Sequence, residues 1–241
     1  MKNNSTDPMC AHYQNQDLGN KSQKILQELV QNKTDIQLYG CQLDYIVFLQ
    51  NVQCANKLLL HYNNIYCLYP LINATYFNEI SFAHNKIFTE QLIFLIDKDM
   101  KELIFMNNDF DEENTTDIGK IIRILSLVLP DNKVKVKLSG KIIENYSYID
   151  YGFPIYEYRW KNQQNWKNLI NDDFISSLVR QCQDEITWIQ EGKLEEDQVH
   201  EIFVQQGFAI NKMKQKRDAC ESFDEFKQVI RNFGQFLLSF K

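Results

Sequence analysis

Hydrophobic and polar residues alternate strictly from Lys133 to Ile142, which predicts a β-strand with one buried and one exposed face. The apolar face consists of Val134, Val136, Leu138 and Ile142. The opposite face consists of Lys133, Lys135, Lys137 and Lys141. A second alternation places Tyr156, Tyr158 and Trp160 on one side and Ile155, Glu157 and Arg159 on the other. We therefore expect a hairpin with a cationic face.

An amphipathic helix is expected directly after this hairpin, over residues 173 to 189. Asp172 or Asp173 can cap its N-terminus, and Gly192 follows its end. Its apolar stripe consists of Phe174, Ile175, Leu178, Val179, Cys182, Ile186 and Ile189. This is the strongest helix pattern in the chain.

The first half of the chain predicts more strands than helices. Residues 36 to 52 form a strand-like run that bends at Gly40, and two further hairpins are expected at 57–62 with 65–72 and at 92–96 with 103–106. Helices are expected near 25–30 and over 118–129, where Pro130 ends the second. This element order favours an α+β class.

Three regions follow from this pattern. Residues 1–20 are polar and predict a flexible tail, and residues 21–190 form the main domain with its C-terminal helix. Residues 191–241 form a helical extension, in which Gly207 ends one short helix and Ser222 with Glu225 has the spacing of a capping box.

Composition limits the function classes. With 44% apolar residues the chain can bury a real core, while a net charge of −6 argues against general coating of nucleic acids. The six cysteines form no C-x-x-C pair, so we expect reduced, mostly buried thiols and no metal site. No apolar run is long enough to span a membrane, and an intracellular location, nuclear or cytoplasmic, is expected.

The segments VKVKLSGKIIENYSYIDYGFPIYEYRW and NDDFISSLVRQCQDEITWI resemble the end of the OB domain in the middle subunit of replication protein A and in the Stn subunit of the telomeric CST complex. The resemblance covers about residues 36 to 190. It implies an OB-like antiparallel β-barrel with a helical insertion and a helical C-terminal region. The competing α+β interpretation is a sandwich-like adaptor domain of a large assembly.

The resemblance also implies binding sites. In an OB groove, single-stranded DNA stacks on aromatic rings and its phosphates contact basic side chains. The residues of those types are Lys133, Lys135, Lys137, Lys141, Tyr156, Tyr158 and Trp160. Core packing of the three aromatic residues and a plainly solvated lysine face remain the alternatives. The helix over 173–189 would bind a smaller OB-fold subunit through Phe174, Leu178, Cys182, Ile186 and Trp188.

We therefore expect a non-catalytic subunit of a single-stranded-DNA-binding or telomere-maintenance complex, without a cofactor. The second hypothesis is a scaffold or adaptor subunit that binds no nucleic acid. The third is a thiol enzyme, in which Cys54 would act with His61 or His84 and with Asp97 or Asp99. No P-loop, nucleophile elbow, H-E-x-x-H or dinucleotide motif supports catalysis.

Overall fold

The structure is a computed structural model of the 241-residue chain. It describes residues 2–109, 115–129, 134–138, 165–190 and 196–239. The side chains of residues 187–190 and of most residues between 196 and 208 lie outside this description.

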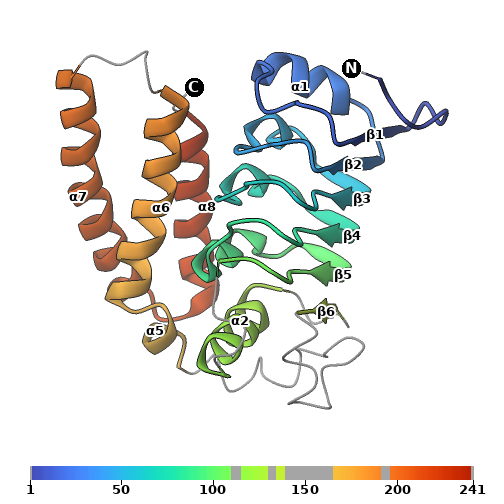
Figure 1. The fold of residues 1–241 in the computed structure, drawn as a ribbon. Helices are drawn as coiled ribbons and strands as arrows, with labels where there is room; N and C mark the ends of the chain where they lie inside the picture. The colour runs from blue at the N-terminus through green and yellow to red at the C-terminus, as the bar shows by residue number, and fades with distance from the viewer. Residues whose placement is uncertain (1, 110–114, 130–133, 139–164, 191–195, 240–241) are drawn as a thin grey trace.

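A sheet of six parallel strands forms one side of the molecule (Figure 1). The strands are β1 (Cys10–Gln14), β2 (Asp35–Tyr39), β3 (Cys54–Leu59), β4 (Tyr76–Ser81), β5 (Asp99–Ile104) and β6 (Lys135–Lys137). Each strand pairs with the next one along the chain, in the order β1-β2-β3-β4-β5-β6. This is an α/β fold whose strand order never reverses, so the sheet has no topological switch point of the doubly wound kind.

The strands belong to a sequence repeat of 22 to 25 residues over the first five strands. Ala11, Ile36, Leu58, Ile80 and Leu103 occupy equivalent buried positions. Around Leu58 the residues Ala55, Leu60, Asn63 and Ile65 complete the pattern L-x-x-L-x-L-x-x-N-x-L, and Phe77, Ile80, Phe82, Asn85 and Ile87 repeat it. That pattern, with a strand and a short helical segment in each repeat, is the arrangement of a leucine-rich-repeat solenoid.

A ladder of buried asparagines holds successive repeats together. The Asn63 side chain donates to the carbonyls of Leu38, Leu60 and His61 and accepts from the N–H groups of Cys41 and Leu43. Asn85 and Asn108 make equivalent bonds one and two repeats later. In the preceding repeat Cys41 takes this place, and its thiol donates to the carbonyls of Tyr13 and Tyr39. The side chains of the ladder thus provide hydrogen-bond partners for backbone N–H and C=O groups in the turns that follow the strands.

Short helical segments return the chain behind the sheet. They are α1 (Gln23–Val30), the 3₁₀ helices η1 (Val47–Leu49), η2 (Tyr69–Leu71) and η3 (Thr89–Leu95), and α2 (Thr115–Val128). Ser22 caps α1 by accepting the N–H of Ile25. The helices expected near 25–30 and over 118–129 are thus confirmed.

Three long helices pack behind the solenoid, on the side away from the sheet (Figure 1). After the short α5 (Trp166–Leu169) come α6 (Asp172–Gln190), α7 (Glu196–Ala219) and α8 (Phe223–Ser239). The α8 helix contacts η2 and η3, and α6 contacts η3. Gly234 of α8 lies so close to the solenoid that an added Cβ would stand 2.9 Å from Cγ1 of Ile72.

The antiparallel OB-like barrel is wrong, because all five strand pairings in the described part of the chain are parallel. The hairpins expected at 57–62 with 65–72 and at 92–96 with 103–106 are wrong for the same reason, whereas the second strand of the hairpin expected over 133–160 lies outside the described residues. Segments 65–72 and 92–96 contain η2 and η3 instead of return strands. The expected strands at 57–62 and 103–106 do overlap β3 and β5, but these strands stack as parallel repeats instead of folding back on their neighbours.

Two further expectations fail at the chain's ends. Residues 1–20 are no free tail, because β1 pairs with β2, Leu18 is buried, and the Asn3 side chain bonds the backbone of Cys10 and His12 at the sheet edge. Gly207 lies inside α7 and does not end it. The helix over 173–189 and the capped last helix are confirmed, since Ser222 Oγ accepts the N–H of Glu225.

Candidate functional site

The outward face of the sheet changes character along the strands. One row across the strands, near their middle, consists of Asp35, Lys57, Glu79, Glu102 and Lys135, which are neighbours in register. The next outward row toward the C-terminal ends of the strands mixes polar and apolar side chains: His12, Gln37, Leu59, Ser81, Ile104 and Lys137.

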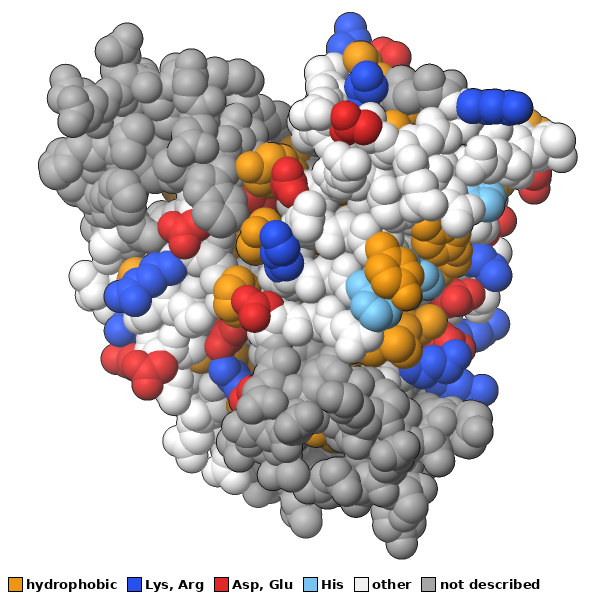
Figure 2. Space-filling view, viewed as in Figure 1, with side chains coloured by type: hydrophobic (Ala, Val, Ile, Leu, Met, Phe, Trp, Pro, Cys, Tyr) orange, Lys and Arg blue, Asp and Glu red, His pale blue; other side chains and the backbone are white. Residues whose placement is uncertain are grey.

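Five ring side chains gather at these strand ends, and we call them the strand-end patch: His12, Tyr39, His61, Tyr62 and His84. The Tyr39 ring lies between His12 and His61, with ring centroids 5.7 and 5.1 Å away. Tyr62 and His84 stack face to face, 4.1 Å apart and 11° from parallel. Figure 2 shows histidine side chains beside hydrophobic ones over the sheet side of the molecule. Three of the chain's four histidines thus meet in one place.

The backbone at Tyr62 and His84 is unusual for such large residues. Both have a left-handed conformation, with φ of 56° and 58°. The equivalent positions of other repeats hold Asn15, Gly40 and Asn107, residue types that tolerate this conformation. Bulky side chains there cost about 1 kcal/mol each, and such outliers concentrate at functional sites. The ladder explains the turn, but it does not require an aromatic side chain in it.

Burial favours the uncharged form of two rings in the patch, His61 and Tyr39. Burial lowers the pKa of His61, and nearby His84 acts in the same direction, while the Glu79 carboxylate opposes them. Burial and then Glu79 raise the pKa of Tyr39. Both rings are therefore uncharged at neutral pH.

Four members of the charged row have partners within the sheet. Lys57 pairs with Glu79 at 3.4 Å, and Glu102 pairs at 2.5 Å with Lys137, which lies two residues beyond the row in β6. Asp35 accepts a 2.8 Å hydrogen bond from the Asn56 amide. The row therefore offers a polar rim beside the patch.

The residues expected to bind DNA are only partly described. Lys135 and Lys137 lie in β6, with Val134, Val136 and Leu138 buried as the alternation predicted. Lys137 is ion-paired with Glu102. The remaining residues of the set lie outside the described residues: Lys133, Lys141, Tyr156, Tyr158 and Trp160.

The stripe expected to bind a partner subunit is buried within this chain. Phe174, Leu178, Cys182 and Ile186 are each at most 3% exposed. Their helix contacts η3 and α7, so the stripe covers the solenoid's own core. The Trp188 side chain lies outside the described residues.

The residues of the thiol hypothesis do not meet. Cys54 begins β3, whereas His61 lies beyond its other end, roughly 23 Å away at strand geometry. Asp97 pairs with Lys227 and Arg231 of α8 instead. Among the described residues there is also no group of three or more His, Cys, Asp or Glu side chains placed to hold a metal ion.

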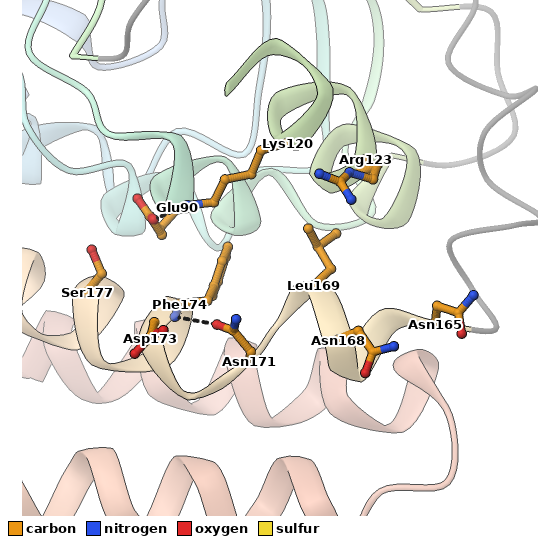
Figure 3. A pocket seen from close by; sticks show the side chains of 10 residues that line it. All are labelled: Glu90, Lys120, Arg123, Asn165, Asn168, Leu169, Asn171, Asp173, Phe174 and Ser177. Carbon is orange, nitrogen blue, oxygen red and sulfur yellow. Dashed lines mark hydrogen bonds and ion pairs between the residues drawn. The ribbon is translucent and has the colours of Figure 1, made fainter. Parts of the chain in front are cut away.

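A polar pocket of about 640 Å³ lies between α2 and the start of α6 (Figure 3). Lys120 and Arg123 line one wall, and Asp173 lines the opposite one. Lys120 is paired with Glu90 at 2.5 Å, and the Asn171 side chain accepts the N–H of Phe174. The pocket's polar groups therefore largely serve the junction of the solenoid with the helices.

The patch residues were missed because the repeat was missed. Tyr39 and His61 are 22 residues apart, as are Tyr62 and His84, so each pair occupies equivalent positions of adjacent repeats. Asn63 and Asn85 show the same spacing of 22 residues and would have revealed it.

In the described part of the chain, no helix is both long and apolar enough to cross a lipid bilayer. Comparisons with family models, with curated proteins and with solved structures found no match for this chain.

Proposed function

We propose that this protein is a non-catalytic binding module, a scaffold or adaptor subunit that holds a protein partner on the outward face of its sheet. The observation that supports this most is the strand-end patch, where Tyr62 is 62% exposed although its left-handed backbone disfavours a large side chain. An exposed aromatic residue kept at a conformational cost is best explained by a contact that it makes.

The architecture suits this role. Solenoids present extended surfaces made from equivalent positions of successive repeats, and these surfaces bind partners. Tyrosine is enriched at protein interfaces, where a polar rim usually surrounds the apolar centre. The strand-end patch and the charged row beside it have this arrangement.

A single-stranded-DNA function receives no support from this geometry. The described strands form a parallel sheet and no OB barrel, and Lys137 is paired with Glu102. Most of the other residues expected to bind DNA lie outside the described residues. Phosphate binding gains its free energy from unpaired cations that release counterions. We therefore favour a protein partner.

The test is comparative affinity capture from native extract with quantitative mass spectrometry. Wild type, a Tyr39→Ala/Tyr62→Asn variant and an Ile25→Ala control are used as baits, since Ile25 is an exposed apolar residue on α1 away from the sheet. We expect at least one protein to be retained by wild type and the control and lost from the patch variant. Identical retention by all three baits would contradict the proposal.

A further inference from the structure

We propose that Cys67 and Cys182 form a reversible disulfide under oxidising conditions, which covalently joins α6 to the solenoid. Cys67 lies two residues before η2, and Cys182 lies in the middle of α6, 115 residues further along the chain. Both are free thiols in the structure. The inference goes beyond the proposed function and does not depend on it.

Hydrogen bonds bring the two thiols together where α6 packs on the solenoid. The Cys67 thiol donates to the backbone carbonyl of Gln181, the residue directly before Cys182, at 3.5 Å. The side-chain amide of Gln91, in η3, lies 3.5 Å from the Cys182 sulfur. The carbonyl oxygen of the same Gln91 side chain accepts the N–H of Leu68, which directly follows Cys67. Each thiol is thus held beside the chain neighbour of the other.

Burial controls when this pair reacts. Both side chains are fully buried, and burial raises the pKa of Cys67, with the neighbouring Cys182 thiol and Glu185 carboxyl acting in the same direction. A thiol attacks a disulfide only as the thiolate, and a closed interior excludes the oxidant. The reaction therefore proceeds while α6 is locally displaced from the solenoid, and the bond then fixes α6 in its packed position.

The reaction balances with a low-molecular-weight disulfide as the oxidant. One protein thiol loses its proton, and its sulfur attacks the small disulfide, which gives a mixed disulfide and releases one small thiolate. The second protein thiolate attacks the cysteine sulfur of the mixed disulfide and releases the other small thiolate. The two cysteines together lose two electrons and two protons, which the small disulfide gains as it becomes two thiols. Excess small thiol reverses both steps.

The experiment treats the full chain with excess glutathione disulfide, blocks the remaining thiols with N-ethylmaleimide and maps disulfide-linked peptides by mass spectrometry. We expect two peptides joined through Cys67 and Cys182. Closing so long a loop should raise the melting temperature by roughly 10 °C, and dithiothreitol should reverse this increase. Cys67→Ser should abolish both effects. The matched control Cys54→Ser should keep both, because Cys54 is exposed at the start of β3.

Treatment that leaves Cys67 and Cys182 as thiols, or that attaches glutathione to each of them singly, would overturn the inference. Linked peptides without a higher melting temperature would contradict the joining of α6 to the solenoid. Wild type carries both measurements, so the test stands even where Cys67→Ser does not fold. The same treatment in denaturing urea should give mixed pairings among the six cysteines. A Cys67–Cys182 link that is no more frequent in the folded chain than in urea would also overturn the inference.

Discussion

At the scale of single residues, Asn63 contributes most clearly to the stability of the solenoid. Its side chain makes five hydrogen bonds to buried backbone groups. Asn63→Ala leaves several of these groups unsatisfied and should lower the free energy of unfolding by about 3 kcal/mol or more. The adjacent Asn64→Ala is the control and should change it by less than about 0.5 kcal/mol in urea denaturation. Similar effects of the two variants would contradict the ladder.

The Tyr62 side chain is expected to contribute to partner binding and not to the stability of the fold. Asparagine tolerates the left-handed conformation better than tyrosine, so Tyr62→Asn should leave the melting temperature unchanged or raise it. The same variant should lose the captured partner. A clear drop in melting temperature would show that the Tyr62–His84 stack mainly stabilises the fold.

Glu185 should make stability depend on pH. It is 1% exposed, and burial raises its pKa from 4.5 to about 8, although the nearby Cys67 thiol acts in the opposite direction. The folded state therefore retains a proton that the unfolded state releases above about pH 4.5. Stability should fall as pH rises toward 8, by up to about 1.4 kcal/mol per pH unit.

Urea denaturation between about pH 5 and pH 6.5 checks this, and Glu185→Gln should flatten the slope. This window avoids Lys98, whose pKa is lowered to about 7 by burial. Lys98 makes stability rise with pH, but only above about pH 7. A wild-type slope that persists in Glu185→Gln would assign the dependence to another group.

At the scale of elements, the packing of α8 on the solenoid depends on Gly234. A Cβ there would stand 2.9 Å from Cγ1 of Ile72, whereas nothing lies within 4 Å of one added at Gly119 in α2. Gly234→Ala should therefore destabilise the protein by about 1–3 kcal/mol, despite alanine's better helix propensity. Gly119→Ala should stabilise it by about 0.5–1 kcal/mol. Thermal unfolding of both variants measures the difference in their melting temperatures. Equal changes in melting temperature would contradict the close packing of α8 on Ile72.

At the scale of the whole molecule, an ion-pair cluster attaches the C-terminal helices to the solenoid. Asp97, in the turn before β5, pairs with the buried Lys227 at 2.9 Å and with Arg231. Asp97→Asn keeps a residue that tolerates the local φ of 51° but removes the charge. Hydrogen exchange in α8 should accelerate while β3 and β4 stay protected. Uniform acceleration would mean that helices and solenoid unfold as one unit.

The sequence by itself determined the elements whose pattern is local. Two patterns identified buried faces correctly: the alternation in Val134, Val136 and Leu138, and the helical spacing of Phe174, Leu178 and Cys182. Both follow from the order of residues alone, because side-chain direction repeats every two residues in a strand and every 3.6 in a helix. The cap at Ser222 was equally local. The resemblance to an OB domain rested on the same local alternation, which parallel and antiparallel strands share.

Only the tertiary structure decided how the strands pair and what covers each buried face. Short apolar runs separated by turns fit hairpins and solenoid repeats equally well, and the choice depends on contacts between residues 22 apart. The same stacking placed Tyr39 beside His61 and Tyr62 beside His84. The tertiary structure also buries the apolar stripe of α6 against η3 and α7. The stripe is therefore part of the core and not the expected partner surface.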